Sequence, residues 1–145
     1  MIGLIQRVST ASVNVAGQQI AAIDQGILLL LGIERTDDQQ QADKLLHKVL
    51  HYRIFADAND KMNLNLQQIG GGLLIVPQFT LPADTTSGNR PSFTPAAPPA
   101  LGAALFDYFC QQAAQLHNKV GQGQFGADMQ VGLINDGPVT FWLKN

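Results

Sequence analysis

Few residues in this chain have the types and spacing that known catalytic or ligand-binding motifs need. Residues 121–126 spell G-x-G-x-x-G, the spacing of a dinucleotide-binding loop, but such a loop follows a strand and opens a helix. Here a predicted helix precedes the glycines and a predicted strand follows them, which favours a flexible link. His47 and His51 lie four residues apart, as in zinc proteases, but Lys48 stands where a general-base glutamate would be. A solvated helix flank is therefore favoured over a metal site.

The remaining reactive side chains also lack partners. Cys110 is the only cysteine and lies beside Phe109 in a predicted helix, so a core position is favoured over a nucleophile. His117, near the end of that helix, is expected to face its negative dipole end. The sequence contains no G-x-S-x-G elbow, Walker A loop or E-x-x-H pair. Standard hydrolase motifs are thus absent, and we expect neither a metal nor another cofactor.

Two short segments are left that can carry a site. The first, residues 78–80 (Q-F-T), ends a predicted buried strand with two polar side chains beside an aromatic ring. The second, residues 135–138 (N-D-G-P), is a Gly-Pro turn, whose simplest interpretation is an ordinary hairpin. Neither segment identifies a reaction on its own.

The strands that must position these segments follow from hydrophobic patterning. Alternation predicts a hairpin of residues 2–15 and 19–23. Unbroken apolar runs predict strands that are buried on both faces at residues 27–31 and 73–79. Residues 129–134 and 139–143 read as two further strands, joined by the Gly-Pro turn.

Two long helices are predicted between these strands. Thr36 and Gln39 match a capping box that opens a helix with apolar spacing from Ala42 to Arg53. A second amphipathic helix covers residues 101–116. Residues 81–99 hold five of the seven prolines and read as a long surface loop, and loops of this length are usually functional.

Length and composition limit the class of protein. The 145 residues are 46% hydrophobic and 14% charged, which predicts one domain, residues 1–145, with a buried core. A single cysteine, no signal peptide and no apolar run long enough to span a bilayer predict a cytoplasmic protein without a membrane partner. The formal net charge of −2 argues against a broad DNA-binding surface but leaves room for a local RNA contact.

With both segments in view, the sequence closely resembles the D-aminoacyl-tRNA deacylases. The likeness runs through the whole chain in one order: I-Q-R-V at 5–8, Y-R-I-F at 52–55, K-M-N-L-N at 61–65, Q-F-T-L at 78–81, R-P-S-F at 90–93, A-D-M-Q-V at 127–131 and N-D-G-P-V-T-F-W-L at 135–143. The resemblance implies an α/β fold with a mixed, mostly antiparallel sheet of barrel-like curvature. It also implies a homodimeric hydrolase that cleaves the ester between a D-amino acid and the terminal adenosine of tRNA.

In that family a Gly-cis-Pro element, matched here by Gly137 and Pro138, reaches into the partner subunit's active site. Its main-chain groups hold the amino acid, an L side chain meets the wall, and L-aminoacyl-tRNA is rejected. Glycine has no side chain to reject, so glycyl-tRNA is an expected substrate. The resemblance suggests that Arg7 helps to hold this element.

The same resemblance assigns Gln78 and Thr80 to catalysis, and Phe79, Phe125 and Met129 to substrate binding. A threonine without a positioned base is a poor nucleophile near neutral pH. The favoured mechanism therefore uses water, assisted by the ribose 2′-hydroxyl, with main-chain N–H groups of Phe79 or Thr80 stabilising the oxyanion.

One residue departs from the family pattern. Similar proteins usually have serine before Q-F-T, whereas this chain has Pro77, which removes a hydroxyl and a backbone donor. Proline within a strand also indicates an edge or a bulge at that point. Two alternatives to the hydrolase stay open: a silent RNA-binding dimer that sequesters mischarged tRNA, which Pro77 favours, and a structural interaction domain.

Overall fold

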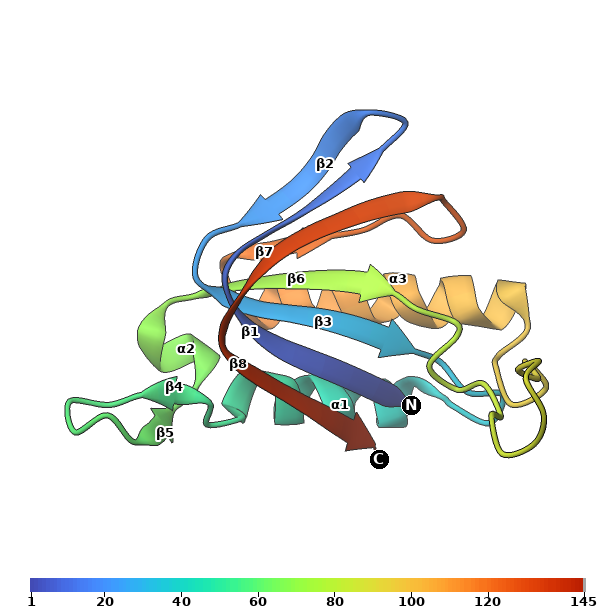
Figure 1. Cartoon of the computed structure of the whole chain (residues 1–145), viewed down its shortest axis with the longest axis horizontal. Coiled ribbons are helices and arrows are strands. Elements are labelled where there is room, and N and C mark those ends of the chain that lie inside the picture. Colours follow the sequence, from blue (N-terminus) through green and yellow to red (C-terminus); the bar gives the residue numbers. More distant parts are fainter. Residues whose placement is uncertain (145) are drawn as a thin grey trace.

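A curved, six-stranded mixed sheet forms the framework of the computed structural model, which describes residues 1–144 (Figure 1). Its strands are β1 (Ile2–Val15), β2 (Gln18–Ile23), β3 (Gly26–Gly32), β6 (Gly72–Pro77), β7 (Val120–Gln122) and β8 (Met129–Lys144). Three pairings are antiparallel, β1 with β2, β3 and β8, and two are parallel, β3 with β6 and β6 with β7. The mixed, mostly antiparallel sheet that we predicted is confirmed.

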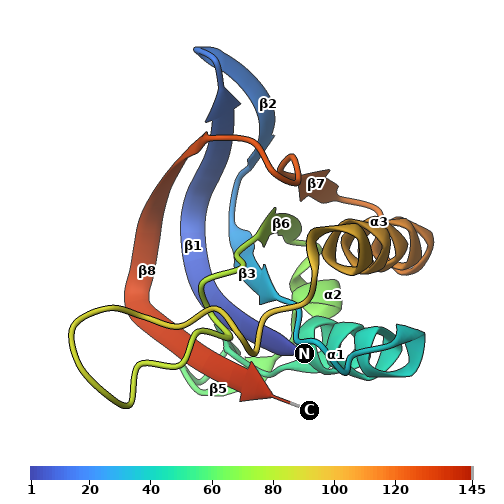
Figure 2. The same cartoon turned by 90° about the vertical axis from the view of Figure 1, so that its right-hand side faces the viewer.

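Strand β1 carries the curvature because it belongs to both halves of the sheet. On one edge its first half pairs with β3 and its second half with β2, while β8 follows the other edge from end to end. Figure 2 shows β1, β2 and β8 bending together away from the helices. The second half of β1, together with β2 and the first half of β8, covers the sheet face opposite the helices.

Strand β8 is continuous, so the predicted pair of strands joined by a Gly-Pro hairpin is wrong. Its pairing with β1 passes from Gln6↔Thr140 to Val8↔Asn135. One residue of β1 therefore faces four residues of β8, which we call the Gly-Pro bulge (residues 136–139). Extra residues in one strand leave the ladder and bend it locally, so the bulge projects without interrupting the strand.

The long helices are α1 (Gln39–His51) and α3 (Pro99–Leu116). The predicted capping box at Thr36 is wrong, because Asp38 is the N-cap and its carboxylate accepts a hydrogen bond from the Gln41 N–H at 3.1 Å. Arg53 lies beyond the end of α1. A short helix, α2 (Leu66–Ile69), and a small hairpin of β4 (Phe55–Ala56) and β5 (Met62–Leu64) were not predicted.

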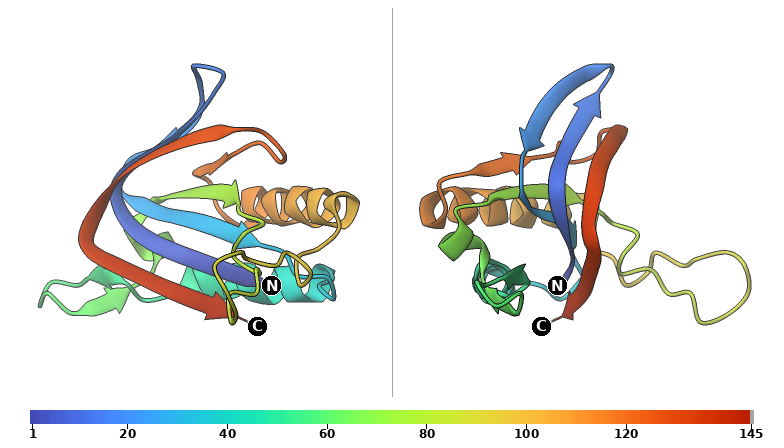
Figure 3. Two further views of the ribbon diagram at one scale, coloured as in Figure 1. Left: turned by 45° about the vertical axis from the view of Figure 1, so that its right-hand side comes forward. Right: turned by 60° about the vertical axis from the view of Figure 1, so that its left-hand side comes forward.

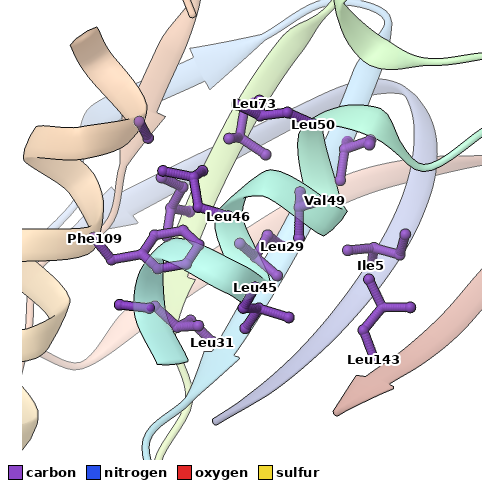
Figure 4. Close-up of a cluster of buried hydrophobic side chains, with 14 of the residues drawn as sticks. Ile5, Leu29, Leu31, Leu45, Leu46, Val49, Leu50, Leu73, Phe109 and Leu143 are labelled. Atoms are coloured by element: carbon purple, nitrogen blue, oxygen red, sulfur yellow. The ribbon is translucent and has the colours of Figure 1, made fainter. Parts of the chain in front are cut away.

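Both long helices cover one face of the sheet and bury the main core there. Leu29 of β3, Leu46 of α1 and Phe109 of α3 meet in this cluster (Figure 4). A second cluster on the other face joins Leu28 and Val76 to the bent ends of β1 and β8. No helix in the described part of the chain is both long and apolar enough to cross a membrane.

Cys110 lies in the main core, as predicted. Burial, with a smaller contribution from the Asp107 charge, raises the pKa of its thiol to about 12. The thiolate that a nucleophile needs is therefore scarce at neutral pH.

A charged cluster closes the core beside the start of β1. The Met1 ammonium donates to Asp37 at 2.6 Å and to Glu34 at 2.9 Å, and Lys144 donates to Glu34 at 2.7 Å. Asp37 also accepts from the Glu34 N–H and is buried. Burial opposes ionisation of Glu34, but the Lys144 and Met1 hydrogen bonds lower its pKa below 4.5. Its contribution to stability is thus present at neutral pH and is lost as the pH falls through that folded-state pKa.

We expect Asp37→Ala to lower the free energy of unfolding by about 3 kcal/mol, because it leaves a buried ammonium without its nearest carboxylate. Urea denaturation followed by circular dichroism measures the change. Asp107→Ala, which removes an exposed carboxylate from α3, is the control and should change stability by less than about 0.5 kcal/mol. Equal midpoints for the two variants would show that the cluster is not needed for stability.

Candidate active site

A cavity of about 720 Å³ lies where β6 ends, beside the start of β8 and the first turn of α3. We call it the β6 cavity. The segment from residue 78 to residue 98, which leaves β6 and returns to α3, borders it and extends outward as a long loop (Figure 3). The lining residues are Arg35, Val76, Pro77, Gln78, Phe79, Phe93, Ala96, Ala97, Pro98, Pro99, Phe125, Gly126, Ala127, Met129 and Val131. The lining is therefore mainly apolar, as small-molecule sites usually are.

The Q-F-T segment forms a turn directly after β6, so the predicted strand ends two residues too late, at Phe79 rather than Pro77. The Gln78 N–H still donates to the Leu31 carbonyl of β3 at 2.8 Å, which fixes the start of the turn. The Gln78 side-chain amide donates to Thr80 Oγ1 at 2.5 Å. Within the described residues, the main-chain N–H groups of Phe79 and Thr80 have no hydrogen-bond partner. The turn thus offers two free donors beside the cavity.

Aromatic side chains and a methionine shape the walls. Phe79 is 61% exposed and lies 5.3 Å, centroid to centroid, from Phe93 of the long loop. Phe125 packs against Phe106 of α3, and Met129 Sδ accepts from the Gln124 N–H at 3.3 Å. The structure therefore brings Gln78, Phe79, Phe125 and Met129 together around one cavity.

Thr80 does not line the cavity and reaches it only through Gln78. None of the three histidines lines the cavity either. His47 and His51 stack on each other on the exposed side of α1, and no group of three metal-ligating side chains occurs among the described residues. His117 is the C-cap of α3, and its ring contacts the Gly71 carbonyl at 2.7 Å rather than the end of its own helix. A general base for Thr80 is therefore not found at the cavity among these residues.

Pro77 fits its position without the loss of a sheet hydrogen bond. Because Gln78 N–H points to β3, the nitrogen of Pro77 points to the opposite side, toward β7. On that side the pairing stops at Ile75↔Gln122, so no β7 residue faces Pro77. Strand β6 as a whole lies between β3 and β7, but at Pro77 it has a neighbour on the β3 side only, so the edge that we expected at this point is confirmed.

The Gly-Pro bulge lies outside the β6 cavity of its own chain. Gly137 and Pro138 are exposed, the peptide bond between them is cis, and Gly137 has a φ of +133°. Arg7 Nε donates to the Asp136 carbonyl at 2.9 Å, and Arg7 Nη1 donates to the Ile54 carbonyl at 2.7 Å. Arg7 thus ties the bulge to the segment that follows α1.

The glycine-rich segment is not a nucleotide loop. Strand β7 contains Gly121, and the chain then turns into β8 without forming a helix. Gly123 is needed for packing, because a Cβ there would lie 2.9 Å from Met129 Sδ and 3.2 Å from Pro77 Cδ. Strand β7 was not predicted, so the flexible link that we expected is wrong for its first part; no helix follows the glycines before β8, which leaves them without the context of a dinucleotide loop.

Sequence reasoning missed the contribution of two segments to the lining. Arg35 follows β3, and residues 96–99 lead into α3, far from Q-F-T in sequence. Only the proline-rich composition of residues 81–99 pointed to function. Arg35 meets the loop through an isolated bridge, Glu34↔Ala96. The two bridge residues are far apart in sequence, so no local spacing rule could predict this contact.

Comparison with known proteins finds relatives over almost the whole chain. The profile of the family described as D-Tyr-tRNA(Tyr) deacylase matches residues 4–144. A D-aminoacyl-tRNA deacylase of Pseudomonas putida (strain F1) is 62% identical over 144 residues, 99% of each chain. Another, from Stutzerimonas stutzeri (strain A1501), is 62% identical over 145 residues, all of both chains.

Two solved structures have the same fold. A protein described as "c-Myc DNA Unwinding Element Binding Protein" superposes with a TM-score of 0.96 at 37% identity and covers 100% of this chain and 99% of its own. A second, described as "a probable eukaryotic D-amino acid tRNA deacylase", has a TM-score of 0.85 at 17% identity and covers 98% and 97%. The second likeness concerns the fold alone.

Proposed function

Because the chain belongs to the D-Tyr-tRNA(Tyr) deacylase family, we propose that it hydrolyses the ester between a D-amino acid and the 3′-terminal adenosine of tRNA. The observation that carries this proposal is the β6 cavity, whose wall includes Gln78 and Phe79 of the Q-F-T-L motif. Its size suits an aminoacyl-adenosine, and its apolar lining suits a base and a ribose. We expect the reaction in the cytoplasm, with no metal or cofactor.

In the proposed reaction, water rather than a side chain attacks the ester carbonyl. Thr80 Oγ1 accepts a hydrogen bond from the Gln78 amide. An oxygen whose lone pair accepts a hydrogen bond is a weaker nucleophile. The N–H groups of Phe79 and Thr80, which have no hydrogen-bond partner among the described residues, would donate to the oxyanion. The bond to the ribose 3′-oxygen then breaks, and this oxygen takes the proton that the attacking water loses, relayed by the 2′-hydroxyl. The products are the free amino acid and tRNA.

Chirality is proposed to be read by the Gly-Pro bulge of the partner subunit. Gly137 and Pro138 are exposed and lie outside the cavity of their own chain, so they are available to a neighbour. Ile134 and Trp142, 62% and 51% exposed, lie on the same strand and offer apolar surface for a dimer contact. Main-chain groups of the bulge would hold the α-amino group, and an L side chain would clash with the wall. A thousandfold rejection needs about 4 kcal/mol, which one steric clash can supply.

Three other functions are less well supported. A silent RNA-binding dimer would protect the ester, whereas an enzyme destroys it. DNA binding enters through the description of the 37% identical structure, but a net charge of −2 does not favour a duplex-binding surface. An interaction domain without chemistry leaves the cavity unexplained.

The proposed function first predicts which substrates are cleaved. The purified protein should release amino acid from D-tyrosyl-tRNA and from glycyl-tRNA, and at least about a thousandfold more slowly from L-tyrosyl-tRNA, because only the L side chain is excluded. Release of radiolabelled amino acid is measured with substrate and with enzyme in excess. Complete inertness of glycyl-tRNA at high enzyme concentration would contradict a purely steric filter. An ester protected in a single turnover would instead identify the silent RNA binder.

A second prediction concerns Pro77, where similar proteins have serine, and Thr80. Pro77→Ser should leave kcat/KM for D-tyrosyl-tRNA within about threefold, because the favoured mechanism uses no side-chain nucleophile at that position. Thr80→Val should lower it by up to about tenfold, through loss of the acceptor that positions Gln78. Thr80→Ser keeps that acceptor and should restore the rate.

Two results would reject this mechanism. One is an inactive wild-type protein that Pro77→Ser activates, because a serine would then be required. The other is a loss of about 10⁴-fold or more in Thr80→Val, the size expected for removal of a nucleophile. Thr85→Val, an exposed threonine of the long loop, is the matched control.

The shared site can be tested by complementation. Ala97→Trp should fill the cavity, and Gly137→Val should distort the bulge, because even a Cβ there would lie 2.8 Å from Val139 Cγ2 and 3.1 Å from Arg7 Nη2. Each variant alone should be inactive. Co-expressed at equal levels, they should recover about a quarter of wild-type activity, since about half of the dimers are mixed and each has one intact site. Mixed dimers without activity, or a monomer in analytical ultracentrifugation, would contradict the arrangement.

A further inference from the structure

Arg35 is the one charged side chain among the described residues that line the β6 cavity. Every other lining residue is apolar or neutral, and neither a carboxylate nor a histidine is present in the lining. Arg35 is exposed, so water screens its charge on one side, but the apolar lining on the cavity side screens it less than open water does and leaves an attraction for anions there. The cavity is therefore selective for the sign of a ligand's charge at this position.

Two hydrogen bonds hold Arg35 against the long loop. Its N–H donates to the Pro95 carbonyl at 3.0 Å, and its Nε donates to the Thr94 carbonyl at 3.1 Å. The neighbouring bridge Glu34↔Ala96 fixes the same two segments. Attachment through Nε orients the plane of the guanidinium while it uses only one of the five N–H donors.

The guanidinium has no carboxylate partner within the described chain. Glu34, its neighbour in sequence, is already engaged by Met1 and Lys144. By contrast, Arg7 is paired with Asp136 at 3.3 Å. The two Nη groups of Arg35 therefore remain free to bind a ligand in two-point fashion, the geometry that a guanidinium offers to phosphate.

We propose that Arg35 binds the phosphodiester on the 5′ side of the terminal adenosine. This inference rests on the proposed function. The reacting end of the substrate is dipolar, with a positive α-amino group on the amino acid and its nearest negative charge on that phosphate. Attraction of the phosphate and repulsion of the ammonium both favour the same orientation, with the ester directed away from Arg35. One residue would thus add affinity and set the direction in which the terminal nucleotide enters the cavity.

The test compares two small esters that differ only in the phosphate: 2′(3′)-O-D-tyrosyl-adenosine and its 5′-methyl-phosphate diester. For Arg35→Gln, we expect kcat/KM to fall about tenfold to a hundredfold with the phosphodiester and to stay within about twofold with the nucleoside, because charge-assisted hydrogen bonds are lost only with the former. Arg35→Lys, which keeps the charge but not the two-point geometry, should fall between wild type and Arg35→Gln. Added salt should reduce the wild-type preference for the phosphodiester.

Lys61→Gln is the matched control, since it removes the same charge from the turn between β4 and β5. This turn lies at the left of Figure 1, whereas the long loop beside the cavity lies at the right. The control should leave both rates unchanged. Thermal melting of each variant, followed by circular dichroism, verifies that the fold is intact.

The outcomes separate this proposal from the proposed function. Equal losses on both esters in Arg35→Gln would mean that Arg35 only braces the loop at Thr94 and Pro95, and would overturn the phosphate role. A preference for the phosphodiester that falls equally in Lys61→Gln would also overturn it, because the effect would then come from overall charge. If wild type cleaves neither ester nor D-tyrosyl-tRNA, the proposed function fails and this inference fails with it.

Discussion

The hydrogen-bonded ladder along both edges of β1 is the constraint on which the rest of the structure depends. Because β1 pairs with β2, β3 and β8, its bend forces the whole sheet to curve. In the same ladder, four residues of β8 lie opposite one residue of β1. The residues of the Gly-Pro bulge therefore have no ladder partner to keep them in the plane of the sheet. Two features of the structure follow from this ladder. The curved sheet leaves room for a cavity at the end of β6. The Gly-Pro bulge projects from β8, and Arg7 holds it through a hydrogen bond to the Asp136 carbonyl.

The cavity depends on where strand pairing stops. Strand β7 leaves β6 at Ile75, so the last residues of β6 have a neighbour on one side only. That opening allows Pro77 without an unmade ladder bond and turns the chain at Gln78 toward the cavity. It also leaves the Phe79 and Thr80 N–H groups without partners. Unpaired donors at the end of a rigid strand are well suited to stabilise a developing negative charge, because little reorganisation is needed.

Local patterns predicted those features of the fold that depend on local interactions. The apolar runs at 27–31 and 73–79 predicted strands because both faces of each strand are buried, and the spacing of α1 and α3 predicted helices because each helix buries one face. The predicted capping box at Thr36 is wrong because Asp38, two residues later, is the N-cap. The continuity of β8 could not be predicted from turn chemistry, because it is imposed by pairing with β1, more than a hundred residues away in sequence. The resemblance drew attention to Gln78, Phe79, Phe125 and Met129, but nothing local pointed to Arg35, whose place depends on contacts with residues 94–97.

The described lining of the cavity contains no side-chain nucleophile paired with a general base. This is consistent with what the hydrolysis of an aminoacyl ester requires. Such an ester carries its own neighbouring 2′-hydroxyl, so the protein need supply only orientation and stabilisation of the oxyanion. The side chains that hold the ester can then be uncharged. A carboxylate or imidazole in the wall would bind the α-amino group and draw it away from the groups that should hold it. The protein's selectivity would therefore rest on shape at the amino acid and on charge at the phosphate, two ends of the ligand that different parts of the fold can adjust independently. Such a division would allow a cavity whose described lining is mainly apolar, with one cation, to act on a polyanionic substrate.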